Sequence, residues 1–180
     1  MIIDSIHISA RHVYFGHHGR EAGSEPTVAV QEVEAVEGFG LRGDRFFGHR
    51  AGYKGQVTLL SSEVVSALRG QFGLPGLTGA ELRRNVLVSG VDLSGLIGRR
   101  FWVQGVRLEG TEECRPCPWM DRAVAPGAEA WLRGRGGLRC RILSTGVLRV
   151  GEAGLRVEEG GAGSGVSAPR AFRAPPLAGG

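Results

Sequence analysis

Short apolar segments separated by glycine-rich turns are the feature that most limits how this chain folds. Glycine makes up 31 of the 180 residues, well above the roughly 7% of average proteins. Apolar and polar residues alternate over 2–9 and again over 27–36, as in strands with one buried face. Long helices do not alternate regularly with these strands, which disfavours a doubly wound parallel sheet. The pattern predicts a mainly β fold, namely a β-barrel with a few short peripheral helices.

The remaining segments fit this architecture. Ser61 or Ser62 is placed to cap a helix that runs to about Phe72. Thr78 and Glu81 have the spacing of a capping box before a second, short helix. Further elements are expected as follows: a long structured loop over 38–55, strands over 56–60, 85–89, 101–109 (with a bulge or tight turn at Gly105) and 138–144, a helix over 126–133, and a hairpin formed by 147–150 and 155–157.

Length and composition indicate the organisation and the environment. We expect one domain over 1–158 and a disordered tail over 159–180, which is rich in glycine, alanine and proline. No apolar run is long enough to cross a membrane, and the first residues lack the features of a signal peptide. We therefore expect a cytoplasmic protein without a membrane partner. Three cysteines in a reducing compartment argue against a disulfide framework.

The charge of the chain is mild. Its formal net charge is +4, and of the 22 basic residues all except Lys54 are arginine. No basic stripe with interleaved aromatic residues suggests a nucleic-acid partner. An anionic small molecule is compatible with this charge.

Residues 111–121, Thr-Glu-Glu-Cys-Arg-Pro-Cys-Pro-Trp-Met-Asp, carry the strongest chemical signal. The positive charge of Arg115 beside Cys114 and Cys117 favours the thiolate, which attacks sulfur and binds metals. Pro116 and Pro118 restrict the backbone on both sides of Cys117. The residues alone leave four interpretations: a zinc site, a redox pair, two buried structural thiols, or a reactive Cys117 that carries sulfur or binds a metal. Zinc lacks a second ligand pair nearby, and a redox pair lacks the preceding βαβ pattern.

Other polar clusters also have two interpretations. Arg42 and Arg45 around Asp44 either cradle a phosphate or form an ion pair that fixes the loop. The run 83–85, Arg-Arg-Asn, either grips an anionic group or is a solvated helix end. His12, His17 and His18 either bind a metal or lie on a polar surface, and Cys140 is expected in the core.

Taken in order, these motifs resemble the MOSC domain, which is named for the C-terminal domain of molybdenum-cofactor sulfurase. The resemblance covers roughly residues 1–158. It rests on the opening strand 2–9, Gly-Phe-Gly-Leu-Arg-Gly-Asp-Arg-Phe-Phe at 38–47, Lys-Gly-Gln-Val-Thr-Leu-Leu-Ser at 54–61, Arg-Arg-Asn-Val-Leu-Val-Ser-Gly-Val-Asp-Leu at 83–93, Leu-Ile-Gly-Arg-Arg-Phe at 96–101 and Cys-Arg-Pro-Cys at 114–117.

The resemblance implies a β-barrel fold and a reactive Cys117. Members of this family are proposed to carry sulfur as a persulfide, or to hold the pterin molybdenum cofactor with this cysteine as a molybdenum ligand and reduce N-hydroxylated compounds. It implies that Arg45, Lys54, Arg84 and Asn85 surround the site, and we add Arg115 as the cation beside the thiol.

The expected partners follow from these two activities. Sulfur transfer requires a cysteine desulfurase, and reduction of a small-molecule substrate requires an external electron donor. Two alternatives remain: a non-catalytic binding module with structural cysteines, and a zinc-stabilised domain.

Overall fold

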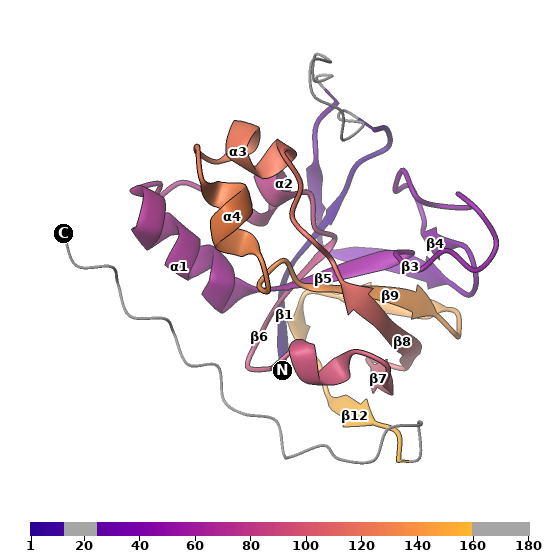
Figure 1. The fold of residues 1–180 in the computed structure, drawn as a ribbon. Helices are drawn as coiled ribbons and strands as arrows, with labels where there is room; N and C mark the ends of the chain where they lie inside the picture. Colours follow the sequence, from indigo (N-terminus) through magenta and orange to yellow (C-terminus); the bar gives the residue numbers. More distant parts are fainter. Residues whose placement is uncertain (13–24, 160–180) are drawn as a thin grey trace.

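The computed structural model describes residues 1–12 and 25–159, and most of their regular structure is strand (Figure 1). This confirms the predicted mainly β class. The predicted tail from residue 160 onward, His17 and His18 lie outside the described residues.

The elements are β1 (Ile2–Ile8), β2 (Val28–Val30), β3 (Glu32–Val36), β4 (Gly40–Leu41), β5 (Val57–Ser61), α1 (Ser62–Phe72), α2 (Gly79–Leu82), β6 (Val86–Ser89), η1 (Ser94–Leu96), β7 (Arg100–Val103), β8 (Val106–Glu113), α3 (Trp119–Ala123), α4 (Ala128–Leu132), β9 (Leu138–Ile142), β10 (Gly146–Arg149), β11 (Gly151–Glu152) and β12 (Leu155–Val157).

The strands form two sheets. The larger one has nine strands, with the order β11-β1-β6-β5-β9-β8-β7-β12 and β2 attached to β1. The smaller one has the order β10-β3-β4. The larger sheet ends at β11 and β12, which do not pair with each other in the described structure, so it is open. The expected closed barrel is therefore wrong, although the mainly β class is right.

The expected hairpin near the end of the domain is also wrong. β10 pairs with β3, β11 pairs with β1, and β12 pairs with β7. The turn signal at 151–154 marked where the chain changes direction, but it held no information on which strands become partners. Each of the three strands finds a different neighbour, and together they tie the two sheets to each other.

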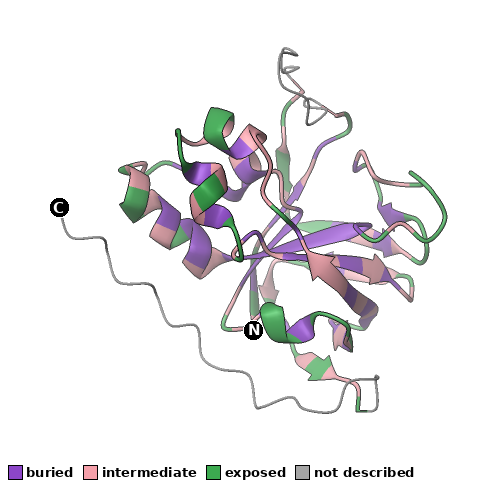
Figure 2. Cartoon of the chain, viewed as in Figure 1, coloured by how far each residue is buried: buried purple, intermediate pink, exposed green. Residues whose placement is uncertain are grey.

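The central strands β5 and β6 separate two hydrophobic cores. Val57, Leu59, Val86 and Val88 point into a core between the sheets, whereas Leu60 and Leu87 belong to a second core under the helices. Because these two strands are parallel and covered on both faces, they contain runs of apolar residues rather than an alternating pattern. Figure 1 shows the four α-helices gathered on one side of the large sheet, and Figure 2 shows that these helices contain buried residues, which pack with Leu60 and Leu87.

Local signals predicted the helix starts well. Ser61 accepts a hydrogen bond from the Val64 amide at 3.2 Å and caps α1, and Thr78 and Glu81 form the capping box of α2. Gly105 lies in a tight turn between β7 and β8, in which Gln104 and Gly105 have φ of 48° and 80°. The short helix α3 was not predicted from the sequence. Within the described ranges, no helix is both long and apolar enough to span a membrane.

His7 gives the fold a pH dependence. It is 6% exposed on β1, and its Nδ1 has no hydrogen-bond partner in the described structure. Burial lowers the pKa of His7 below 6.5, although nearby Glu81 opposes this shift. The unfolded chain then binds a proton that the folded chain does not, so stability is retained above pH 6.5 and is lost as the pH falls below it. The slope for one proton is at most about 1.4 kcal/mol per pH unit.

We expect His7→Gln to flatten this dependence. The free energy of unfolding, measured in urea between pH 5 and pH 8, tests it. The matched control is His49→Gln, which makes the same substitution at an exposed histidine. Equal slopes in the wild type and His7→Gln would show that another group is responsible.

Candidate functional site

Residues 114–117, which we call the cysteine segment, connect β8 to α3 and have no regular secondary structure. Cys114 is 4% exposed, whereas Cys117 is half-buried. The Cys114 amide donates to the Gly137 carbonyl at 2.8 Å, and the Cys117 carbonyl accepts from the Met120 amide at 2.8 Å, in the first turn of α3. The segment is therefore fixed at both ends, and Cys117 is the more accessible of its two thiols.

Two glycines let the chain pass directly behind Cys114. A Cβ atom on Gly136 would lie 2.2 Å from the Cys114 carbonyl oxygen, and one on Gly137 would lie 2.1 Å from the Leu59 carbonyl oxygen. No side chain fits at either position without moving backbone. The wall formed by residues 134–137 is therefore packed between the cysteine segment and β5.

Arg84 holds this wall and the cysteine segment together. Its Nε donates to the Gly136 carbonyl at 2.9 Å, its Nη2 to the Cys114 carbonyl at 3.0 Å, and its Nη1 to the Leu82 carbonyl at 3.0 Å. All three guanidinium nitrogens of Arg84 thus bind backbone. Arg84 therefore lies beside the cysteine segment and holds its backbone in place.

Asp44 and Asn85 form the buried support of Arg45. Asp44 accepts hydrogen bonds from the Asn85 Nδ2 at 3.1 Å and from Arg45 Nη1 at 3.4 Å. Asn85 in turn accepts from the Thr58 hydroxyl and amide. Asn85 is 3% exposed, so it reaches the site through Asp44 and has no open face for a ligand.

Arg45 lies in an electropositive environment. Its side chain is 10% exposed. Burial lowers the pKa of Arg45, Asp44 opposes this shift, and Arg84 adds to it. The pKa of Arg83 is also lowered, to about 10. The main cause is burial, and the positive charge of Arg45 is the second. One buried carboxylate therefore faces several guanidinium groups, which favours an anionic ligand.

Arg139 and Tyr53 also lie near Cys114, which the sequence did not predict. Burial lowers the pKa of Arg139, but the electrostatic interaction with Cys114 raises it, so that the net shift is upward. Arg139 also forms an ion pair with Glu112, in which its Nη1 lies 3.2 Å from the carboxylate. Burial raises the pKa of Tyr53, while Arg139 lowers it and Cys114 raises it. Alternation along β9 puts Arg139 on the face opposite to the core-facing Leu138 and Cys140, but only the pairing of β9 with β8 shows that it lies beside Glu112, two residues before Cys114.

The other predicted cations have different surroundings. Lys54 binds Glu112 at 2.9 Å near the surface, and Arg115 is exposed next to the thiols. Arg42 pairs with Glu34 rather than with Asp44, so of the expected loop ion pair only Arg45–Asp44 is formed.

Aromatic rings border Arg45. The Phe46 and Tyr53 rings stack with centroids 5.1 Å apart, and His12 meets Phe46 edge-on at 4.8 Å. The Arg45 guanidinium lies 4.8 Å from the Phe46 ring centre, a cation–π contact that orients it. His12, for which the sequence left open a metal site or a polar surface, therefore packs with the aromatic rings beside Arg45.

Cys140 is fully buried, as predicted, and burial raises the pKa of its thiol. In the part of the chain that the structure covers, no group of three or more His, Cys, Asp or Glu side chains is placed to hold a metal ion.

Comparison with known proteins identifies the family. The model of the MOSC domain matches residues 45–153, which include Arg45, Arg84 and both thiols of the cysteine segment. The chain belongs to the MOSC domain family. A search of curated proteins found no significant match.

Solved structures share the MOSC fold. YuaD from Bacillus subtilis superposes with a TM-score of 0.65 at 20% identity, covering 87% of this chain and 96% of YuaD. YiiM from Geobacillus stearothermophilus gives a TM-score of 0.65 at 18% identity, covering 88% of this chain and 75% of YiiM. YiiM from Escherichia coli gives a TM-score of 0.57 at 17% identity, covering 84% and 69%. At these sequence identities, the similarity to the solved structures shows the fold alone.

Proposed function

We propose that this MOSC protein binds the molybdenum cofactor and that Cys117 is its reactive residue. Cys117 is either a thiolate ligand of the metal or a persulfide that carries sulfur. The activity is then sulfur transfer or the reduction of N-hydroxylated compounds. One observation supports this most: a half-buried thiol follows a backbone segment that Arg84 fixes next to Arg45 and Arg139.

The side chains present suit this cofactor. A thiolate is a soft ligand of the kind that binds molybdenum. The pterin part of the cofactor carries a phosphate. Arg45 and Arg139 each bind one carboxylate, Asp44 and Glu112, and their remaining N–H groups are available to the phosphate, with Arg115 exposed at the surface. When bound, the cofactor would supply the metal centre for the reduction. The protein's own residues position the thiol, balance the negative charge and, through the stacked Phe46 and Tyr53, cover one side.

A persulfide on Cys117 has the same electrostatic needs. Its terminal sulfur is anionic and gains from the same guanidinium groups. This version of the proposal uses a cysteine desulfurase as sulfur donor, while the reductase version uses an electron-donor protein and a small-molecule substrate.

We expect Cys117→Ala to abolish molybdenum binding. The measurement is molybdenum per chain after anaerobic purification from a host that makes the cofactor. The matched control is Cys140→Ala, which removes a buried thiol from β9 and leaves the metal content near that of the wild type. Circular dichroism confirms that each variant folds.

The other outcomes separate the alternatives. No molybdenum in the wild type, together with an extra sulfur atom on Cys117 after reaction with a desulfurase, would establish the sulfur carrier. Equal molybdenum and sulfur loading in Cys117→Ala and the wild type would refute the proposal. An unloaded wild type whose Cys117 does not react with alkylating agents would indicate a non-catalytic module.

A further inference from the structure

A cavity lies against the wall formed by residues 134–137. Its volume is about 210 Å³, and it is lined by residues from α1, the η1 segment, the end of β8 and the wall itself. The arginines and aromatic residues described around the cysteine segment do not line this cavity. They are Arg45, Phe46, Tyr53, Arg84 and Arg139. This cavity, which we call the rear cleft, is therefore distinct from the proposed cofactor site.

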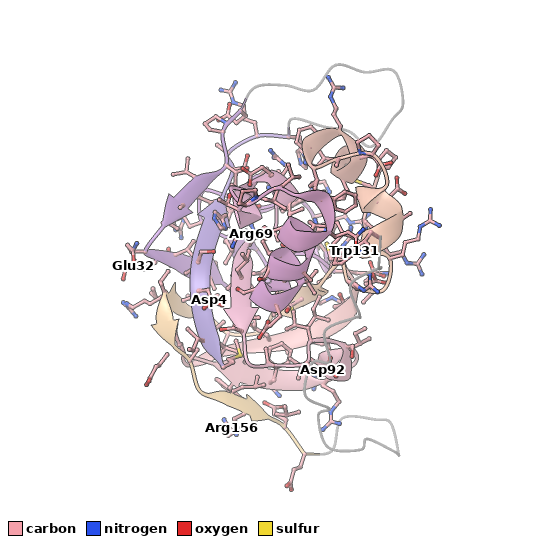
Figure 3. The ribbon with its side chains drawn as sticks, turned by 90° about the vertical axis from the view of Figure 1, so that its left-hand side faces the viewer. Asp4, Glu32, Arg69, Asp92, Trp131 and Arg156 are labelled. Atoms are coloured by element: carbon pink, nitrogen blue, oxygen red, sulfur yellow. The ribbon has the colours of Figure 1, made fainter. Side chains whose placement is uncertain are left out.

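The rear cleft has an apolar side and an acidic side. Val64, Val91, Leu93 and Ile97 make the apolar side, and Ile97 is an exposed large hydrophobic residue at 44%. Asp92 and Glu113 make the acidic side. Figure 3 shows Asp92 below Trp131 on the same side of the molecule.

The two carboxylates keep binding capacity. Asp92 accepts from the Ser94 amide and hydroxyl, and Glu113 accepts from the Gly136 amide at 3.3 Å, in each case through one oxygen. Neither forms an ion pair with a residue in the described ranges. Arg135 also lines the cleft, but its guanidinium binds the Trp131 carbonyl at 2.8 Å and lies over the Trp131 ring. Arg135 is thus committed to α4.

The chain leaves its described part close to this cleft. The Glu158 amide donates to the Arg100 carbonyl at 2.9 Å, and Arg99 donates to the Glu158 carbonyl. Arg100 is three residues beyond Ile97, which is at most about 11 Å of chain. Residues 160–172 reach up to about 40 Å when extended, so the segment that follows can reach the cleft with ample slack.

The composition of that segment matches the cleft. Phe172 is the only aromatic residue in 160–180, and Arg170 and Arg173 flank it. An apolar ring between two cations complements an apolar wall beside two unpaired carboxylates. Because the segment belongs to the same chain, its effective concentration is in the millimolar range, so weak contacts suffice for substantial occupancy.

We propose that the rear cleft is the docking site of the chain's own residues 170–173. Phe172 packs against Val91 and Ile97, and the flanking arginines face Asp92 and Glu113. The docked segment contacts the wall whose other side holds Cys114. This proposal does not depend on which cofactor or sulfur species Cys117 carries.

Photo-cross-linking in the full chain tests the docking. Phe172 is replaced by p-benzoylphenylalanine, and the cross-linked residues are mapped by peptide mass spectrometry at low micromolar concentration. We expect cross-links within one chain to residues 91–97, lost in the additional variant Ile97→Glu. Ile97 is largely exposed, so this substitution leaves the core intact. Cross-links to other parts of the chain, or only between chains and lost on dilution, would overturn the proposal.

Hydrogen exchange gives a second readout without a probe. Phe172→Ser should raise the exchange rates of amides in 93–97 and 134–137 several-fold, because the docked ring no longer covers them. Val166→Ser is the matched control, since it removes an apolar side chain from the same segment outside 170–173. Equal exchange in the wild type and Phe172→Ser would also overturn the proposal.

Discussion

Gly137→Ala is expected to destabilise the protein by about 3 kcal/mol or more. Gly137 has φ of +90°, which an alanine adopts only with strain. Its added Cβ would also lie 2.1 Å from the Leu59 carbonyl oxygen, so backbone has to move. Leu59 belongs to the central strand β5, and Gly137 binds Cys114. The displacement therefore reaches both the sheet and the cysteine segment.

Urea unfolding of Gly137→Ala and Gly134→Ala measures the two causes separately. Gly134 has φ of +75° but no atom within 4 Å of an added Cβ, so it reports the strain alone. We expect a loss of about 1–2 kcal/mol for Gly134→Ala, the cost of placing an L-residue in the left-handed conformation. A similar loss for the two variants would mean that the wall of residues 134–137 relaxes freely, contrary to the packing described above.

Asp44→Ala is the second substitution with a large expected effect, about 3–5 kcal/mol. The Asp44 side chain is 1% exposed and accepts hydrogen bonds from the Ser9 and Phe46 amides, besides those from Asn85 and Arg45. Alanine leaves these donors buried without an acceptor. It also removes the buried carboxylate that balances Arg45 and the neighbouring arginines.

The control for Asp44 is an exposed ion pair. Glu34→Ala breaks the contact with Arg42 at the surface, where solvent and salt screen the charges, and we expect almost no change in stability. Asp44→Asn keeps an acceptor but removes the charge, so its free energy of unfolding should lie between those of the wild type and Asp44→Ala. If Asp44→Ala unfolds at the same urea concentration as Glu34→Ala, the buried network has little energetic weight.

Much of the local structure follows from short-range sequence signals. Ser61 and Thr78 cap helices because the side chain and the amide that it accepts from lie within the same turn. Apolar and polar residues alternate in β1, β3 and β9 because each of these strands has one buried face and one face toward solvent. The helix α3 was missed because it is a single short turn after Pro118, with little periodicity to detect. The hairpin prediction failed because pairing depends on strands that are distant in the chain.

The candidate site divides in the same way. The motifs around Arg45, Arg84, Asn85 and Cys117 led to the MOSC family from the sequence alone. They did not show that Arg84 and Asn85 act as supports, because their partners, the carbonyls of Cys114 and Gly136 and the Asp44 carboxylate, come from remote segments.

By itself, the sequence determined the mainly β class, the helix starts and the chemical types available for the site. These depend on residue identity, on the periods of about 2 residues in strands and about 3.6 residues in helices, and on the order of the motifs. The tertiary structure alone decided that the large sheet stays open, that Arg139 and Tyr53 lie near Cys114, and that Lys54 and Arg139 share the Glu112 carboxylate. The physical reason is that strand register and packing between distant segments select these contacts, and neither is encoded in any local stretch of the chain.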